Sequence, residues 1–315
     1  MTPTKIIVID DDPTGCQTVH GCLLLTRWDV DTLLAGLTDA APLFFVLSNT
    51  RAMGAEQAAA VTREICVNLV QALGRLAARG TPVRPLVVSR SDSTLRGHYP
   101  LETDLIAEIL GPFDAHFLVP AFIEGGRITR DCTHFLIVDG EPVPVHRTEF
   151  ARDSVFGYRH SHLPDYVAEK TGGRVPASAV TCLGLEAVRS GVRETLRGLR
   201  GNACCAVDAV AQADLDRFAA DVRAVAGEGG RFLFRSAASL LTALADLPPQ
   251  PLPAGEMGAL ARGGAPGVVL AGSHVRRTTA QLEHLLDEPD VAPVLVDVSR
   301  LPADVLAWRP APSWP

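Results

Sequence analysis

The sequence predicts an α/β fold with a largely parallel sheet flanked by helices, because short apolar runs alternate with helix-like segments along most of the chain. The 315 residues are 47% apolar and include 27 glycines, enough to bury a sizeable core in one large domain or two ordinary ones. A β-hairpin is expected to interrupt this alternation, and a partial second α/β domain is expected to follow.

The expected strands are apolar runs bounded by turn residues, at residues 5–9, 23–26, 43–47, 86–89, 116–119, 204–207 and 231–234. The expected helices lie between these runs, at residues 29–37, 54–79, 100 onward, 185–200, 211–226 and 237–245. Apolar residues recur at helical spacing in the longest of these helices. Pro100 can start the next helix, since the N–H that proline lacks would be unsatisfied there in any case.

Residues 133–146 carry Asp139-Gly140 between apolar runs, which predicts a β-hairpin with a tight turn. Residues 247–266 are too rich in Pro and Gly for a regular element, so we expect a linker there. It would separate an N-terminal domain at 1–246 from residues 267–315, where a strand at 267–271, a helix near 278–286 and a strand at 294–296 are expected. One βαβ unit is too small to bury a core, so we expect this part to be the truncated start of a domain.

The composition excludes several classes of protein. A net charge of −7 is the wrong sign for a general nucleic-acid binder. No apolar stretch is long enough to span a bilayer and no basic then apolar leader begins the chain, which favours the cytoplasm. The seven cysteines are scattered and form no C-x-x-C, so we expect reduced thiols with neither a zinc site nor a disulfide framework.

Three consecutive carboxylates, Asp10, Asp11 and Asp12, end the first expected strand. In open α/β sheets ligands bind beyond the carboxyl ends of the strands. Stacked acids at that position suggest a site for a sugar hydroxyl, for Mg²⁺, or for both. The alternative is a solvated acidic turn.

Polar loops follow four of the expected strands, at residues 10–15, 48–51, 89–97 and 121–130, and a parallel sheet would gather them along one edge. Three kinds of side chain in these loops suit a hydroxy acid. They are the arginines Arg51, Arg90 and Arg96 as forked donors, the acceptors Asp11, Asp12 and Asp92, and the hydroxyls Ser93 and Thr94.

Each of these residues also has a structural explanation. The segment from Asp92 to Thr94 could be a helix cap or turn, and Arg96 could belong to a surface ion pair.

A phosphatase is an alternative function. Asp10, Asp12 and Thr14 form D-x-D-x-T, which resembles the first motif of haloacid-dehalogenase-like phosphatases, with Asp10 as nucleophile and Asp12 as acid/base. Such an enzyme also needs a lysine and a later acidic cluster. Only Lys170 and Asp208 are candidates.

The sequence has neither a P-loop nor a G-x-G-x-x-G signature. The nearest candidate for a phosphate site is Gly272-Ser273, which leaves an expected strand just before a helix. An ordinary turn explains these two residues equally well.

An ordered set of motifs points to a family. From about residue 5 to 297 the chain resembles the four-carbon acid sugar kinases, in the segments I-D-D-D-P-T-G, L-S-N-T-R, R-S-D-S-T-L-R-G, P-A-F-I-E-G-G-R-I-T, D-G-E-P-V-P-V-H-R-T-E-F-A-R-D, F-G-Y-R-H-S-H-L, F-R-S-A-A-S-L and G-S-H-V-R-R-T-T-A-Q-L. The resemblance implies ATP-dependent phosphorylation of the terminal hydroxyl of a threonate, erythronate or 3-oxo-tetronate. It also implies that the N-terminal domain holds the acid and the C-terminal domain most of the ATP.

The resemblance also implies roles for individual residues. Asp11 and Asp12 fall on the family's paired acids, Arg51 on the arginine of its S-R loop, and Ser273 on a serine that resembles part of the nucleotide site. Four residues fall on the substrate loop, where many members have lysine at the first position: Arg90, Asp92, Ser93 and Thr94. We expect Asp12 or Asp11 to be the base, Arg51, Arg90 and Ser93 to clamp the substrate, and Mg²⁺ to arrive with ATP.

The chain departs from the family beyond residue 301, where members continue into glycine-rich nucleotide loops that this sequence lacks. We therefore expect a truncated or frameshifted product that is a poor kinase by itself. The alternative is a non-catalytic module that binds hydroxy acids or pairs with another chain. The sequence leaves homo-oligomer formation open.

Overall fold

The computed structural model describes residues 2–248, 252, 255–256, 258, 267–272, 276–297 and 300. The chain divides into two units, Met1–Pro251 and Leu252–Pro315, each treated by itself below. Most of the expected linker at 247–266 lies outside the described residues, so the domain boundaries remain a prediction.

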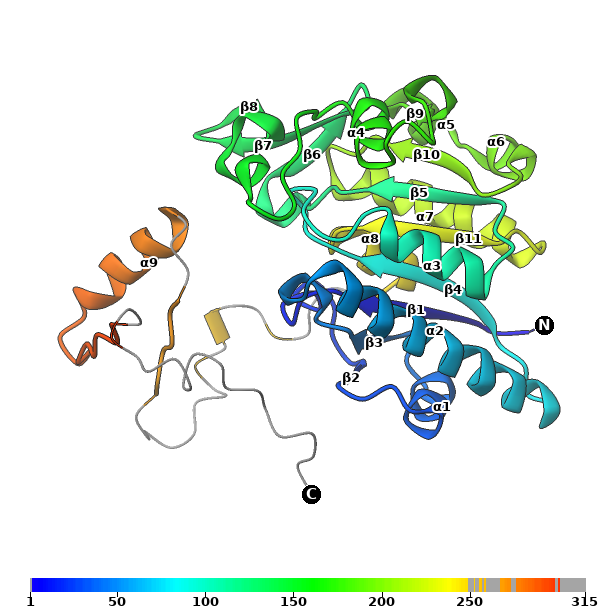
Figure 1. Ribbon diagram of the computed structural model, residues 1–315, viewed down its shortest axis with the longest axis horizontal. Helices are drawn as coiled ribbons and strands as arrows, with labels where there is room; N and C mark the ends of the chain where they lie inside the picture. The colour runs from blue at the N-terminus through cyan, green and yellow to red at the C-terminus, as the bar shows by residue number, and fades with distance from the viewer. Residues whose placement is uncertain are drawn as a thin grey trace. The chain divides into compact units, whose positions relative to one another are not determined.

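The first unit is built on an eight-stranded sheet whose order is β2-β3-β1-β4-β11-β5-β10-β9 (Figure 1). In chain order its strands are β1 (Thr4–Asp10), β2 (Leu23–Leu25), β3 (Leu43–Leu47), β4 (Arg84–Arg90), β5 (Ala115–Val119), β9 (Thr181–Leu183), β10 (Ala203–Val207) and β11 (Phe232–Ser236). Every pairing between these strands is parallel. The predicted α/β fold with a largely parallel sheet is confirmed.

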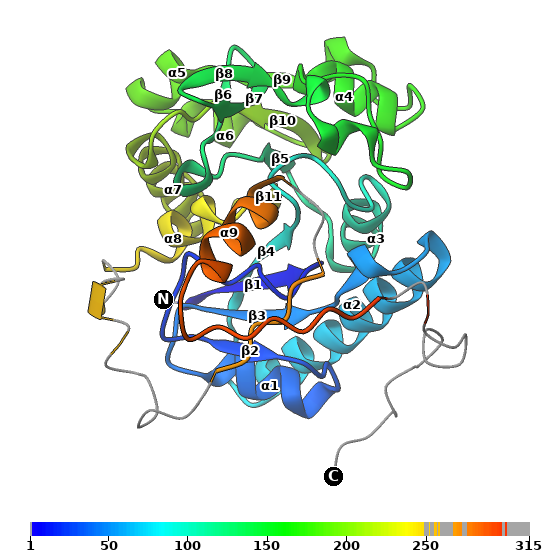
Figure 2. The same cartoon turned by 90° about the vertical axis from the view of Figure 1, so that its left-hand side faces the viewer.

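Helices cover both faces of this sheet. They are α1 (Val30–Thr38), α2 (Ala55–Ala78), α3 (Leu101–Leu110), α4 (Leu163–Lys170), α5 (Leu185–Ser190), α6 (Arg193–Gly198), α7 (Gln212–Gly227) and α8 (Ser239–Ala245). Figure 2 shows α2 and α3 on one side of the strands and α7 and α8 on the other. Side chains alternate between the two faces of β1, as a strand requires. Ile7 and Ile9 therefore join the core under α1–α3, while Ile6 and Val8 join the core under α7 and α8.

A small antiparallel sheet follows β5. It consists of β6 (Arg127–Arg130), β7 (Thr133–Val138) and β8 (Glu141–Pro144). The predicted hairpin is β7 and β8, and its turn places Asp139 and Gly140 at φ of 51° and 86°, as a tight hairpin turn demands. Strand β6 was missed, because its residues were assigned to a polar loop.

Several local predictions were wrong. The helix expected at 185–200 is two short helices, since Gly191 takes a φ of +111° between them and breaks the helical path. In the second unit α9 (Arg276–Leu286) forms, but the strands expected at 267–271 and 294–296 do not. Their apolar residues are exposed, with Val268 at 93% and Leu295 at 94%. A strand needs a hydrogen-bonded neighbour, and the described part of the chain supplies none there.

The cysteines also differ from expectation. Cys132 and Cys182 form a disulfide that joins the start of β7 to the edge strand β9. Fifty residues separate these cysteines in the sequence, so no local spacing could reveal the pair.

No helix in the described residues has the length and apolar character needed to cross a membrane.

Candidate functional site at the carboxyl edge of the sheet

Three of the four polar loops leave neighbouring strands. Asp10, the last residue of β1, lies in register with Leu47 of β3 on one side and Arg90 of β4 on the other. The loops that follow these strands therefore start side by side, as the sequence predicted. The fourth loop follows β5, which β11 separates from β4.

The end of β3 is fixed to the end of β1, and this places Arg51. Ser48 donates from both its N–H and its hydroxyl to the carbonyl of Asp10, at 2.9 and 2.8 Å. Asn49 then takes a left-handed conformation that starts the 3₁₀ turn Thr50–Ala52, and Arg51 N–H donates to the Asp11 carbonyl at 3.1 Å. The Arg51 guanidinium is thereby held over the acidic triplet.

Arg51 binds two of the three acids. Its Nη2 and Nε donate to the two Asp11 carboxylate oxygens at 2.5 and 3.3 Å, and its Nη1 donates to Asp12 Oδ2 at 3.2 Å. A forked pair of this kind is among the stronger hydrogen-bonded ion pairs. The Asp92 carboxylate lies 3.9 Å from Nη1. Arg51 is therefore largely occupied by carboxylates of the protein itself.

The acidic triplet is split into three different environments. The side chains of Asp10 and Asp11 are 1% and 2% exposed, whereas that of Asp12 is 25% exposed. Burial raises the pKa of Asp10 to about 7 against the opposing charge of Arg90, and burial also raises the pKa of Asp11 against Arg51 and Arg235. Burial works in the same direction on Asp12, but hydrogen bonds from Thr14 and the charge of Arg51 outweigh it and hold the pKa of Asp12 below its usual value. Asp12 is thus the accessible, ionised acid.

The loop after β4 is organised by Asp92. Thr94 and Arg96 both donate to Asp92 Oδ2, the latter from Nε at 2.8 Å. Although burial opposes ionisation, these bonds and the charges of Arg96 and Arg51 lower the pKa of Asp92 to about 2. Arg96 also lies over the Phe150 ring, 4.9 Å from its centroid. The alternative explanation of Asp92, as a residue that stabilises a turn, is therefore supported in part, because Asp92 accepts hydrogen bonds from its own loop.

Three side chains from outside this loop bind three consecutive carbonyls of it. His134 Nε2 donates to the carbonyl of Ser93 at 2.7 Å, Tyr158 to that of Thr94 at 2.6 Å, and Tyr166 to that of Leu95 at 2.9 Å. The Ser93 carbonyl can only accept, so His134 carries its proton on Nε2. Burial lowers the pKa of His134 to about 4 and keeps it neutral. The antiparallel sheet and α4 therefore hold this loop in place.

A second buried ion pair lies beside Asp11. Arg235 of β11 donates from Nη1 to Glu102 of α3 at 2.5 Å and to Ser89 at 2.7 Å, while Thr50 donates to the other Glu102 oxygen at 2.5 Å. Arg235 and Glu102 were both missed. The F-R-S segment that contains Arg235 was noted only as a motif, and nothing local marks Glu102 within an ordinary helix.

Gly97 is required where these charges meet. Its φ is +117°, and a Cβ there would lie 2.6 Å from Arg235 Nη2 and 3.0 Å from Asp11 Oδ2. A side chain at this position would therefore displace the charged groups.

A family model described as a sugar-binding N-terminal domain matches residues 6–244. The chain belongs to this family. A D-erythronate kinase from Heliobacterium modesticaldum is 28% identical over 226 residues, which make up 69% of this chain and 47% of that enzyme. The resemblance to four-carbon acid sugar kinases is confirmed for the sugar-binding domain.

Solved structures share the fold. A domain of unknown function from Bordetella bronchiseptica, solved as a domain-swapped dimer with bound citrate, matches 77% of this chain and 56% of its own with a TM-score of 0.55 and 24% identity. A second crystal form of that protein gives 25% identity. A Haemophilus influenzae protein matches 76% of this chain and 55% of its own, with a TM-score of 0.54 and 17% identity. The chain therefore spans about half the length of the relatives that it matches.

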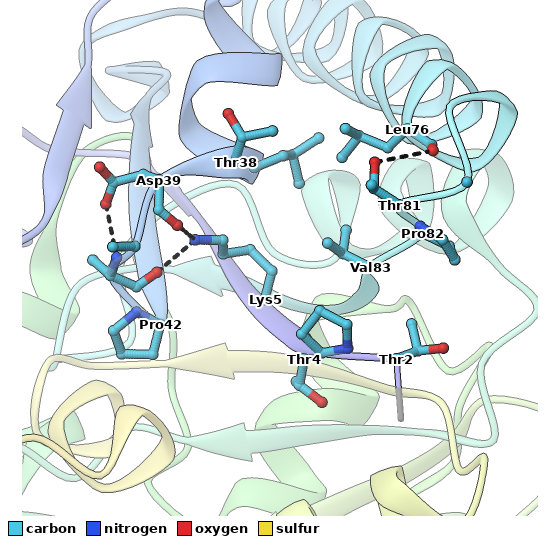
Figure 3. Close-up of a pocket in the computed structure, with 15 residues that line it drawn as sticks. Thr2, Thr4, Lys5, Thr38, Asp39, Pro42, Leu76, Thr81, Pro82 and Val83 are labelled. Carbon is cyan, nitrogen blue, oxygen red and sulfur yellow. Dashed lines mark hydrogen bonds between the residues drawn. The ribbon is translucent and has the colours of Figure 1, made fainter.

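The sugar-binding domain also has a pocket of about 960 Å³ at the opposite, amino edge of the sheet, lined by Thr4, Pro42 and Val83 among others (Figure 3). Its buried Lys5 amine points to the carbonyls of Asp39 and Ala41, at 2.7 and 2.5 Å. That amine is occupied by backbone, and the pocket is remote from the predicted site residues.

The groups that the phosphatase hypothesis requires do not lie at Asp10. Lys170, at the end of α4, donates to the carbonyl of Gly157 at 3.3 Å, and Asp208 accepts from Cys132 N–H at 2.9 Å. This arrangement gives the phosphatase alternative no support.

Of the two residues predicted to contact the nucleotide, only one lies among the described residues. Ser273 lies outside the described residues, and Gly272 is exposed without regular structure. Among the residues described, no group of three or more His, Cys, Asp or Glu side chains could hold a metal ion.

Proposed function

We propose that this chain binds a four-carbon sugar acid at the carboxyl edge of β1, β3 and β4 and takes part in ATP-dependent phosphorylation of the acid's terminal hydroxyl. The observation that carries the proposal is the cluster of alternating arginines and aspartates in a member of a sugar-binding family. The D-erythronate kinase match supports a kinase, and a 25%-identical neighbour was solved with citrate, itself a hydroxy acid.

Asp12 is the proposed base. A proton acceptor must be ionised and within reach of the hydroxyl, and Asp12 is the exposed member of the triplet with a lowered pKa. Asp11 is buried, and its two carboxylate oxygens accept hydrogen bonds from the Arg51 guanidinium. We assign Arg51 to positioning Asp11 and Asp12 rather than to clamping the substrate carboxylate.

The remaining donors suit the acid itself. Arg96 is one-quarter exposed and Ser93 is half-buried, both on the braced loop after β4. Arg90 is enclosed, and its Nε and Nη1 have no hydrogen-bond partner among residues 2–248. Asp92 and Thr94 hold this loop in the geometry that presents Arg96. Bound ATP with its Mg²⁺ would supply the phosphoryl group.

Titration calorimetry of the chain with D-erythronate and D-threonate tests the binding step. We expect saturable heat with at least one acid, and binding about tenfold or more weaker for Asp92→Asn, since a polar group of the loop loses its partners. Asp31→Asn, in an exposed pair with Arg75 on the far helices, is the matched control and should bind normally. A folded chain that binds no four-carbon sugar acid would exclude the proposal.

Acid-dependent release of ADP from Mg·ATP then separates two outcomes. Turnover that Asp12→Asn abolishes while retaining acid binding supports the kinase with Asp12 as base. Acid binding without turnover supports the hydroxy-acid-binding module.

A further inference from the structure

The disulfide between Cys132 and Cys182 has one accessible end. Cys182 is exposed in the edge strand β9, whereas Cys132 is 3% exposed. The free cysteines of the described chain are all buried or half-buried. A dissolved thiol can therefore reach this bond from the Cys182 side, and exposed disulfides are the ones that are usually labile or regulatory.

The buried end of the disulfide lies in the tight turn between β6 and β7. Asp131 and Cys132 take φ values of 51° and 54° in this turn, as a two-residue hairpin turn requires. Cys132 N–H donates to Asp208 Oδ1 at 2.9 Å, and the Cys132 carbonyl accepts from Leu163 N–H at 2.7 Å. These bonds do not depend on the disulfide, so reduction should free the turn from β9 without unfolding the unit.

The strand that leaves this turn reaches the loop after β4. His134 lies two residues beyond Cys132, and its ring accepts from the Thr129 hydroxyl at 2.9 Å and donates to the Ser93 carbonyl at 2.7 Å. A hydrogen bond is lost once its atoms are more than about 3.5 Å apart. A shift of about 1 Å in this part of β7 would therefore release the Ser93 carbonyl.

The loop has two further supports that lie outside the small antiparallel sheet. Tyr158 and Tyr166 donate to the next two carbonyls, those of Thr94 and Leu95. Loss of the His134 contact would therefore loosen the loop at Ser93 and leave the rest of it attached.

We propose that Cys182 is a site of thiol exchange, where glutathione or a similar small thiol opens the bond to Cys132 and loosens the loop that carries Ser93. A glutathione thiolate attacks Cys182 Sγ and forms a mixed disulfide, while Cys132 leaves as a thiolate and takes a proton from water. A second glutathione thiolate attacks the bound glutathione sulfur and releases Cys182, which is protonated in turn. Two glutathiones become glutathione disulfide, and their two electrons reduce the protein.

The loop that is loosened is the one that presents Arg96 and Ser93 to the proposed sugar acid. The oxidised protein should therefore bind the acid more tightly than the reduced protein. This consequence for the ligand rests on the proposed function, whereas the exchange at Cys182 and the change in the loop do not.

The first test uses the full chain without ligand. Mass spectrometry should find glutathione on Cys182 when Cys132→Ser is treated with glutathione disulfide, and Cys132 unmodified when Cys182→Ser is treated in the same way. Reduced glutathione should make backbone amides at 92–96 exchange with deuterium about fivefold faster or more, a typical size of coupling between two sites. Cys182→Ser should exchange like the reduced protein in either buffer, and Cys22→Ser, which removes a cysteine outside the disulfide, should respond like wild type.

The second test measures D-erythronate affinity by calorimetry in the oxidised and the reduced protein. Reduction should weaken binding about fivefold or more. His134→Ala should bind weakly in both states and lose most of this redox dependence, because the contact that links the turn to the loop is already missing.

The inference is overturned if excess reduced glutathione leaves the disulfide closed, or if alkylation shows it open while exchange at 92–96 is unchanged. If the chain binds no sugar acid, the proposed function fails, while the ligand-free exchange experiment still decides whether the disulfide controls the loop.

Discussion

The buried ion pair between Glu102 and Arg235 offers the sharpest test of how the site is built. Their side chains are 4% and 6% exposed, and Glu102 also accepts from Thr50. Replacing Glu102 with alanine leaves the Arg235 charge enclosed without its closest partner. Removal of one member of such a pair costs about 3–5 kcal/mol. For a unit of this size that loss lowers the thermal midpoint by about 6–20 °C.

Urea unfolding followed by circular dichroism measures this loss. The matched control is Glu108→Ala on the same helix, whose ion pair with Arg63 is 61% and 51% exposed and should contribute about 0–1 kcal/mol. The double variant Glu102→Met with Arg235→Met removes both charges and should recover much of the stability. A loss for Glu102→Ala no larger than that for Glu108→Ala would refute the argument that this enclosed pair is essential to the fold.

Three further predictions follow from single positions. Because the folded protein holds a proton on Asp10 up to about pH 7 and the unfolded chain releases it near pH 4, the unfolding free energy should fall between about pH 4 and pH 7. Asp10→Asn should flatten that decline in urea titrations, and an equal decline in the variant would contradict it. Gly97→Ala should destabilise by about 1–3 kcal/mol through its positive φ and the contacts of the added Cβ, whereas Gly74→Ala, with open space in α2, should stabilise by about 0.5–1 kcal/mol. Cys182→Ser should lower stability by up to about 4 kcal/mol, the loop entropy released when its bond to Cys132 is lost; dithiothreitol should remove the difference from wild type, and a difference that persists under reduction would argue against the disulfide.

Local pattern was enough to predict most strands and the edge where the site lies. The apolar run that ends in Asp10 predicted β1, and the turn chemistry of Asp139-Gly140 predicted the β7–β8 hairpin. The helix at 185–200 failed because apolar spacing alone did not show where Gly191 would leave the helical conformation. The unpaired segments at 267–271 and 294–296 failed for a different reason, since strand propensity forms no strand without a partner.

The placement of β11 shows what local pattern could not provide. It was predicted as a strand, but its position between β4 and β5 depends on the connection from β10, which passes β5 before β11 pairs with β4. That insertion delivers Arg235 and Ser236 to the base of the loop after β4. The sequence neighbours of these residues contain no information about which loop they will contact.

The sequence by itself determined that carboxylates, arginines and hydroxyls follow parallel strands, because strand periodicity and strand ends are local properties. Only the tertiary structure decided which charges pair and which remain available. Arg51 is taken up by Asp11 and Asp12 because β3 lies beside β1, and Glu102 meets Arg235 because α3 packs over the sheet near β11. Burial follows from the same packing, so the pKa values of three adjacent aspartates are shifted differently, and Asp12 is the one of the three whose side chain stays partly exposed.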